Sequence, residues 1–178
     1  AADRVRYILE RSPVFRPLRQ RYGLGFEAFM ASKIEVIDGD LQQPMCGLDP
    51  AEHARLTASL DAIVHIAGLT DFTPDPTEAI NVNLHGSVNM ADMAAKCRVP
   101  RLIHVSSCYV AGNASGDIPE AITPGISPNG TKFDVAYELE ALESAVNAAG
   151  KKHPAYSREA KQERIDAGMR RSEALGWP

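Results

Sequence analysis

The sequence is poor in cysteine and has no clustered histidines. Its three cysteines are Cys46, Cys97 and Cys108, and none belongs to a Cys-x-x-Cys pair. They therefore predict neither a disulfide framework nor a zinc site, and they are typical of a protein from a reducing compartment. The five histidines include no His-Glu-x-x-His arrangement, so we predict no metal-dependent catalysis.

A long apolar run and a surplus of positive charge are also missing. No stretch reaches the length of a transmembrane helix, and the first residues contain no apolar core of a secretion signal. The formal net charge of -4 gives no basic surface of the kind that nucleic-acid-binding proteins carry. We therefore predict a cytoplasmic protein with no nucleic-acid partner, in which any membrane contact is made by regions outside these 178 residues.

What is present is the composition of one globular domain, with 44% hydrophobic and 24% charged residues. Arginines crowd its first 21 residues, at Arg4, Arg6, Arg11, Arg16, Arg19 and Arg21. A solvated helical face is the simplest explanation of this cluster. An organelle-targeting peptide is a second, which Asp3, Glu10 and two prolines disfavour, and attraction of a phosphate-bearing ligand is a third.

Three short, β-branched apolar runs predict parallel β-strands: KIEVID at 33–38, DAIVHIAG at 61–68 and RLIHVSS at 101–107. The third run is continuously apolar before its two serines, which is typical of a strand buried on both faces of a parallel sheet. Helix start signals lie between the strands. Asp49 and Asp75 are the expected N-caps, each followed by a proline and, three residues later, by a glutamate.

The resulting order of strand, helix, strand, helix, strand predicts an α/β fold, a partial Rossmann-like doubly wound parallel sheet. We expect a single, incomplete domain over 1–178, with extra helices near its C-terminus. Its three parts are a helical lead-in, a βαβαβ core, and a loop followed by a helical spacer (1–32, 33–112 and 113–178). The spacer contains two predicted helices at 132–149 and 155–175, ended by Gly150 and by Gly176 and Pro178.

Small and polar residues follow each predicted strand, at the edge where open α/β sheets bind ligands. Ala67 and Gly68 would let a ligand lie against the backbone, and Asp40 is placed to accept from an amine or hydroxyl, although an ordinary turn explains each equally well. Strand alternation sends Ser106 and Ser107 toward opposite faces, so at least one meets the ligand crevice. The alternative for these serines is a hydroxyl that caps the strand end.

The helix predicted for 75–97 carries one buried apolar stripe through Ile80, Leu84, Val88, Ala91 and Ala95. Asn83 flanks this stripe and Ser87 lies within it. A buried amide without a partner costs about 1–3 kcal/mol, so Asn83 must bond either to a strand backbone or to a ligand. We predict that His65 and His104 are satisfied core residues and that Cys108 is a buried, inert thiol.

Together these segments resemble the extended short-chain dehydrogenase/reductase superfamily, and within it the fatty acyl-CoA reductases and related thioester reductases. The resemblance covers most of the chain and rests on SPVFRPLRQ, KIEVIDGDLQQPMCGLD, DAIVHIAGLTDF, INVNLHGSVN, LIHVSSCYVAG, GDIPE and the closing LGWP, in this order and spacing. It implies an NADPH-dependent oxidoreductase of lipid metabolism that reduces an acyl thioester, its small-molecule substrate, to an aldehyde or alcohol.

The resemblance also implies roles for individual residues. Contacts to the cofactor come from Asp40, Leu41, Ala67, Gly68 and Ser106, with the first two at the adenine. Asn83 is the helix asparagine of the catalytic group. Ser107 takes the position of the catalytic serine or threonine, where its hydroxyl bonds the substrate oxygen as negative charge develops there.

Two elements of the family pattern are missing. The Gly-x-x-Gly-x-x-Gly turn is absent, since Gly23-Leu24-Gly25 stands in the wrong context, and Tyr156 and Lys161 do not have the Tyr-x-x-x-Lys spacing. The chain is therefore expected to match the middle of a reductase and to reduce no substrate by itself. A non-catalytic module that binds a nucleotide or a partner is one alternative. A sugar-nucleotide epimerase or dehydratase is another, which SPVFRPLR and the helical spacer disfavour.

Overall fold

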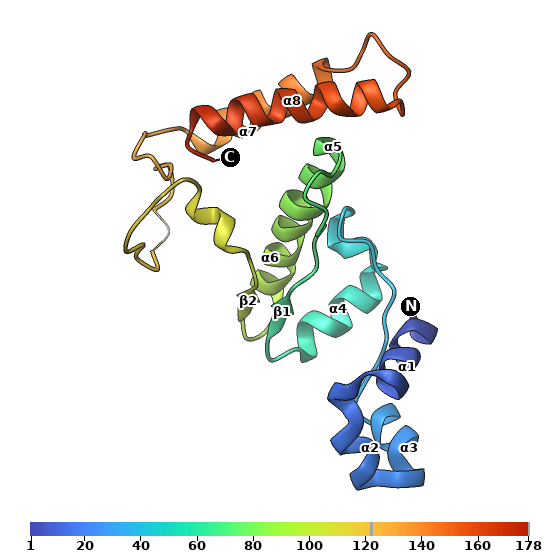
Figure 1. Cartoon of the computed structure of the whole chain (residues 1–178). Coiled ribbons are helices and arrows are strands. Elements are labelled where there is room, and N and C mark those ends of the chain that lie inside the picture. Colours follow the sequence, from blue (N-terminus) through green and yellow to red (C-terminus); the bar gives the residue numbers. More distant parts are fainter. Residues whose placement is uncertain (122, 178) are drawn as a thin grey trace. The chain divides into compact units, whose positions relative to one another are not determined.

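A computed structural model describes residues 1–121 and 123–177 (Figure 1). The chain divides into two compact units, Ala1–Asp40 and Leu41–Pro178. The first unit is helical, with α1 (Ala2–Arg11), α2 (Arg16–Tyr22) and α3 (Phe26–Ala31) joined by 3₁₀ turns at Pro13–Phe15 and Gly23–Gly25. These elements confirm the helical lead-in predicted for 1–32.

The first unit is held together by aromatic packing and one long-range hydrogen bond. Phe26 and Met30 are buried, and the ring of Tyr22 stacks on that of Phe29 with centroids 3.9 Å apart. The guanidinium of Arg19 donates to the carbonyl of Leu9 at 2.6 Å, which joins α2 to α1. The other five arginines of the cluster are exposed, which favours the solvated helical face.

The strand predicted for 33–38 is wrong, because residues 34–40 belong to no helix or strand. The amide of Ile34 donates to the carbonyl of Met30 and so closes the end of α3 instead of joining a sheet. A strand is stable only when a neighbouring backbone satisfies its polar groups. The two strands of the described residues belong to the other unit.

The second unit contains a two-stranded parallel sheet of β1 (Ile63–His65) and β2 (Leu102–His104). Ile63 lies opposite Leu102, and His65 lies opposite His104. Two shorter elements, a turn at Pro44–Gly47 and helix α4 (Pro50–Ser59), precede the sheet. The structure thus confirms an α/β unit with parallel strands, whereas the described residues do not form a complete doubly wound sheet.

The crossover between the strands is one continuous helical rod (Figure 1). It consists of α5 (Pro76–Ala79), a π-helical turn (Ile80–His85) and α6 (Gly86–Lys96). α6 packs on β1 through a core cluster made of Cys46, Ile63, Met93, Ala94 and Cys97. Because α6 is packed on β1, it places the π-turn next to the ends of the two strands.

The predicted apolar stripe of this rod is wrong from Leu84, within the π-turn, onward. Leu84 and Val88 are exposed, as are Ala91 and Ala95, whereas Met93 and Ala94 are buried. A π-turn contains more residues than an α-turn, so it rotates the following side chains out of the regular 3.6-residue register.

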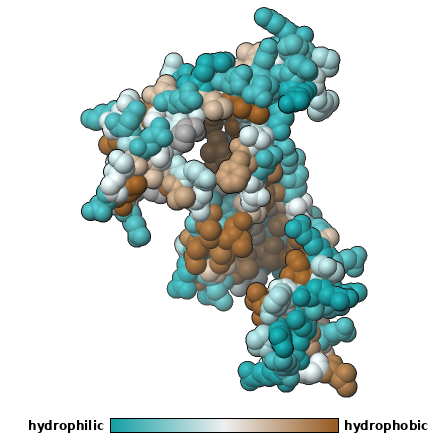
Figure 2. Space-filling model, viewed as in Figure 1, coloured by the Kyte–Doolittle hydropathy of each residue, from teal (hydrophilic) through white to brown (hydrophobic). Residues whose placement is uncertain are grey.

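The prediction that the run at 101–107, which contains β2, is buried on both faces is also wrong. Leu102 and Ile103 are 37% and 57% exposed, because β1 is the one strand that pairs with β2 among the described residues. Val64 in β1 and Ile66 just after it are exposed as well. Figure 2 shows hydrophobic side chains gathered over this part of the chain.

Both predicted N-caps are confirmed. The carboxylate of Asp49 accepts from the amides of Ala51 and Glu52, and that of Asp75 accepts from the amide of Thr77. Asp75 also forms an ion pair with Arg164, 89 positions away in α8 (Arg158–Ala174). The Arg164 guanidinium holds the pKa of the Asp75 carboxyl below its usual range. This pair ties the start of the rod to the C-terminal helices.

The C-terminal part is a pair of packed helices, α7 (Val135–Ala148) and α8, as predicted for the spacer. Gly150 follows α7 with φ +73°, and a Cβ there would lie 2.8 Å from the carbonyl oxygen of Ala160. Gly176 follows α8 with φ +91°, as expected of a helix end. Pro178 lies outside the described residues. None of the described helices is long and apolar enough to cross a membrane.

Candidate functional site

A hollow of about 310 Å³ lies at the carboxyl ends of β1 and β2. Its walls are the segments that follow the two strands and the π-turn of the rod. The residues that line it are Ile66, Ala67, Gly68, Leu69, Thr70, Asn83, Ser87, His104, Val105, Ser106 and Ser107. Because the strands are parallel and in register, their ends meet at one edge and create this hollow.

Five of the predicted site residues lie in this hollow: Ala67, Gly68, Asn83, Ser106 and Ser107. Leu41 does not line it. The carbonyl of Leu41 accepts from the side chain of Asn89 at 2.7 Å, and its Cβ lies close to Gly86 of α6. Asp40 is the last residue of the other unit. The structure therefore assembles the predicted site at two strand ends rather than three.

The side chain of Asn83 binds the backbone beyond β1. Its Oδ1 accepts from the amide of Leu69 at 2.7 Å. A Cβ on Gly68 would lie 3.0 Å from the same oxygen, so the absence of a side chain at residue 68 permits this approach. The sequence left two partners open for Asn83, a strand backbone or a ligand, and in the structure its partner is the backbone at the end of a strand. The π-turn is thereby fixed to the wall of the hollow.

A hydrogen-bonded series leads from the hollow into the core. The hydroxyl of Ser87 donates to the carbonyl of Asn83 at 2.6 Å and lies 3.2 Å from Nε2 of His65. His65 is buried and has this partner, which confirms its prediction as a satisfied core residue. The prediction for His104 is wrong, because it is exposed and lines the hollow, 5.1 Å from the His65 ring.

Sequence reasoning did not assign Ser87 or His104 to the site. One signal for Ser87 was available, because it lies one helical turn after Asn83 and so faces the same side of the rod. His104 is the register partner of His65 across the sheet, a pairing that only the observed register establishes.

Stability is expected to fall when His65 becomes protonated. Burial and the neighbouring His104 lower the pKa of His65 below its ordinary value of 6.5. Between the folded pKa and 6.5 the unfolded chain binds more protons than the folded chain, so the free energy of unfolding decreases as the pH falls through this window. Urea unfolding over a series of pH values measures the slope.

Two variants test this assignment. His65→Gln removes the titrating ring and is expected to flatten the slope. His104→Gln removes one of the two causes of the lowered pKa and is expected to leave a shallower slope than that of the parent chain. An unchanged slope in His65→Gln would show that another group is responsible.

Ser106 and Ser107 lie beyond the sheet, because β2 ends at His104. Strand alternation therefore does not separate them, and both line the hollow. Their hydroxyls make no hydrogen bond to another described residue, in contrast to the strand-capping alternative. The carbonyl of Ser107 accepts from the amide of Val110 and begins a 3₁₀ turn at Cys108–Ala111. Cys108 is exposed, so its prediction as a buried thiol is wrong.

The hollow fits part of a nicotinamide cofactor. Gly68 and Ala67 present backbone with little or no side chain, and the serine hydroxyls add donors and acceptors beside it. A volume of about 310 Å³ is at the lower end of the range for ligand sites, so it suits one portion of a dinucleotide. No group of three or more histidine, cysteine or acidic side chains gathers to form a metal site within 1–121 and 123–177.

The sequence model of an NAD-binding protein family matches residues 1–177 of this chain, and that family is described as male sterility protein. The chain belongs to this family. It is 29% identical to the alcohol-forming fatty acyl-CoA reductase of Simmondsia chinensis over 172 residues, which cover 93% of this chain and 34% of that protein. It is 27% identical to probable fatty acyl-CoA reductase 5 of Arabidopsis thaliana over 189 residues, which cover 100% of this chain and 37% of that protein.

The chain therefore spans about a third of the length of these relatives. Among solved structures, the terminal R domain of the myxalamid PKS-NRPS pathway is similar to it with a TM-score of 0.49 and 22% identity. This match covers 92% of this chain and 36% of the chain in that structure. The family match and these relatives confirm the resemblance seen in the sequence.

Proposed function

We propose that this chain forms part of the cofactor and substrate site of an NADPH-dependent reductase that converts a fatty acyl-CoA to an aldehyde or alcohol. One observation carries the proposal: Gly68, Asn83 and Ser107 line a single hollow at the ends of two parallel strands, in a chain of an NAD-binding family. The names of the relatives, which are fatty acyl-CoA reductases, support this substrate class.

The reduced nicotinamide would supply a hydride to the carbonyl carbon of the thioester. The aldehyde results when the C=O bond re-forms and the C–S bond breaks, so that coenzyme A leaves as its thiolate, and an alcohol requires a second hydride. The protein's part is to position that carbonyl and to stabilise the negative charge that develops on its oxygen. The hydroxyl of Ser107 is exposed in the hollow and is the donor that we assign to this oxygen. Asn83 positions the adjoining wall through its bond to Leu69.

Several finer assignments belong to the same proposal. Asp40 and Leu41 contact the adenine, and Ala67, Gly68 and Ser106 contact the rest of the cofactor. The chain belongs to an NAD(P)-binding domain of a Rossmann-like doubly wound fold. The three free cysteines, of which Cys46 and Cys97 are buried, support a location in the cytoplasm.

A non-catalytic module that binds a nucleotide or a partner is the second candidate. Titration of the chain with NADPH separates the two. Micromolar binding by this chain alone favours the module, because the phosphates would then be held without a glycine-rich turn.

The test of the reductase is an assay of the complete reading frame that contains this chain. With hexadecanoyl-CoA and NADPH we expect cofactor oxidation that depends on the acyl-CoA, accompanied by release of coenzyme A, and slower oxidation with NADH. The ratio of oxidised cofactor to released thiol distinguishes an aldehyde product from an alcohol. The 178-residue chain alone is expected to give no turnover. Absence of acyl-dependent oxidation in the complete protein would refute the proposal.

A further inference from the structure

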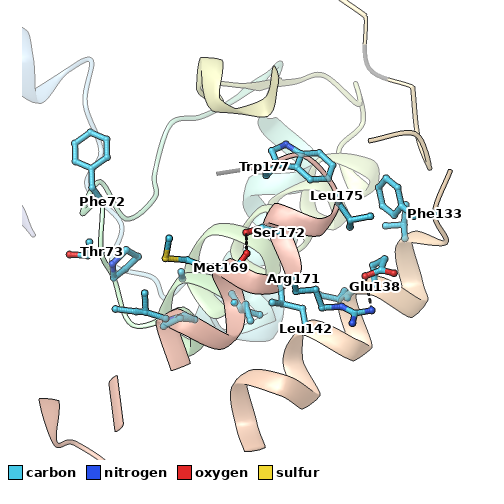
Figure 3. Close-up of a pocket in the computed structure, with 18 residues that line it drawn as sticks. Phe72, Thr73, Phe133, Glu138, Leu142, Met169, Arg171, Ser172, Leu175 and Trp177 are labelled. Atoms are coloured by element: carbon cyan, nitrogen blue, oxygen red, sulfur yellow. Dashed lines mark hydrogen bonds and ion pairs between the residues drawn. The ribbon is translucent and has the colours of Figure 1, made fainter. Parts of the chain in front are cut away.

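A second and larger cavity, of about 810 Å³, lies between α7, α8 and the start of the rod (Figure 3). Its lining is mostly apolar and includes Phe72, Leu139, Leu142, Ile165, Met169 and Leu175. Figure 3 shows side chains from the segment after β1, from α7 and from α8 gathered around it. Cavities of about 300–1,000 Å³ with such walls are typical of sites for apolar small molecules.

The charged side chains in the wall neutralise each other. Glu138 and Arg171 are the two ionisable residues that line the cavity, and they form an ion pair at 2.7 Å. Nε of Arg171 is buried without a hydrogen-bond partner among the described residues. Because Glu138 and Arg171 pair with each other, the wall carries no net charge to select an ionic ligand, and its mostly apolar side chains match an uncharged apolar group.

The larger cavity and the hollow are lined by residues that are neighbours along the chain. Residues 66–70, after β1, line the hollow, and 72–74 line the cavity, while the π-turn contributes Asn83 to one and Ile80 to the other. The ring of Phe72 meets Tyr109 edge to face at 6.2 Å. Trp177, which lines the cavity, donates to the carbonyl of Val110, three residues after Ser107. These contacts bring the segments that line the hollow close to those that line the apolar cavity.

Gly168 keeps one wall of the cavity open. It lies in the interior of α8, where glycine is less favourable than alanine, so helix stability does not explain it. A Cβ there would meet Pro76 at 3.9 Å and Leu142 at 4.0 Å, which is ordinary contact. A larger side chain at this position has to extend into the cavity.

We propose that this cavity binds the hydrocarbon chain of an acyl thioester whose carbonyl lies in the hollow beside Ser107. The acyl class of the ligand rests on the proposed function. The apolar, internally neutralised cavity and the glycine in its wall are independent of the chemistry at Ser107. Binding is therefore measurable without turnover.

The test is calorimetric titration of the 178-residue chain with octanoyl-, decanoyl- and dodecanoyl-CoA, below their micellar concentrations, and with free coenzyme A. We expect each acyl-CoA to bind more tightly than coenzyme A. Burial of a methylene group predicts up to roughly a fourfold gain in affinity for each one added. Equal affinities for coenzyme A and dodecanoyl-CoA would overturn the proposal.

Gly168→Leu fills the cavity and is expected to weaken binding of dodecanoyl-CoA at least tenfold, with an unchanged or higher melting temperature. Arg170→Leu adds the same side chain at an exposed position of α8 and is expected to bind like the parent chain. Ser172→Leu, one turn further along the cavity wall, repeats the test if Gly168→Leu does not fold. A folded cavity variant with parental affinity would overturn the proposal.

Each of the two proposals can be refuted without refuting the other. Binding that responds to Gly168→Leu, in a complete protein that oxidises no NADPH, would uphold the acyl site and refute the reductase. Turnover of hexadecanoyl-CoA that is indifferent to Gly168→Leu would uphold the reductase and refute the acyl site.

Discussion

Replacing Ser107 with alanine in the complete protein is expected to lower kcat about 10²- to 10³-fold with hexadecanoyl-CoA, the usual effect of removing one oxyanion donor. The hydroxyl lies in the hollow and has no described protein partner, so its loss leaves no buried group unsatisfied. KM is expected to change little, because the bond strengthens in the transition state. Steady-state measurement of acyl-dependent NADPH oxidation gives both constants.

Two variants control this result. Ser106→Ala removes the adjacent hydroxyl, which we assign to the cofactor, and is expected to raise KM for NADPH more than it lowers kcat. Ser107→Thr keeps a hydroxyl at the position and is expected to recover part of the activity. Equal losses in Ser106→Ala and Ser107→Ala would contradict the separate roles of the two serines.

Gly112→Ala is expected to destabilise the second unit by about 3 kcal/mol, the sum of a left-handed backbone penalty and an overpacking cost. Gly112 has φ +56°, and a Cβ there would lie 2.5 Å from the carbonyl oxygen of Gly176 and 2.7 Å from the ring of Pro128. The backbone must move to relieve these contacts. The free energy of unfolding in urea measures the loss.

Gly116→Ala is the matched control. Gly116 has φ +85°, but a Cβ there would meet nothing within 4 Å, so only the backbone penalty of about 1 kcal/mol applies. The difference between the two variants isolates the cost of the overlap with Gly176 and Pro128. Equal losses would show that the close approach of these segments does not contribute to stability.

Features that depend on short-range chemistry could be predicted from the sequence. The caps at Asp49 and Asp75 follow from carboxylates placed before prolines, and the helix end at Gly150 follows from a position that excludes a side chain. The meeting of Gly68 and Ser107 follows from two parallel strands, whose ends coincide whatever lies beyond them.

Features that depend on distant partners could not be predicted from the sequence. KIEVID has the composition of a strand, but only a neighbouring backbone makes it one, and residues 34–40 pair with none among the described residues. The buried face of α6 depends on the π-turn at Ile80–His85, and no local pattern revealed that change of register. The exposure of Ile103 and His104 likewise depends on what packs beside β2.

The exposed apolar surface of the sheet has a practical consequence for colloidal behaviour. Val64 and Ile103, on the two strands, and Ile66 and Val105, just after them, are each more than half accessible to solvent. Each strand has one neighbouring strand among the described residues. Uncovered strands of this kind invite edge-to-edge association between molecules. Heats of dilution and light scattering over a range of protein concentrations therefore have to accompany every titration of the chain, so that clustering of protein molecules is not counted as ligand uptake.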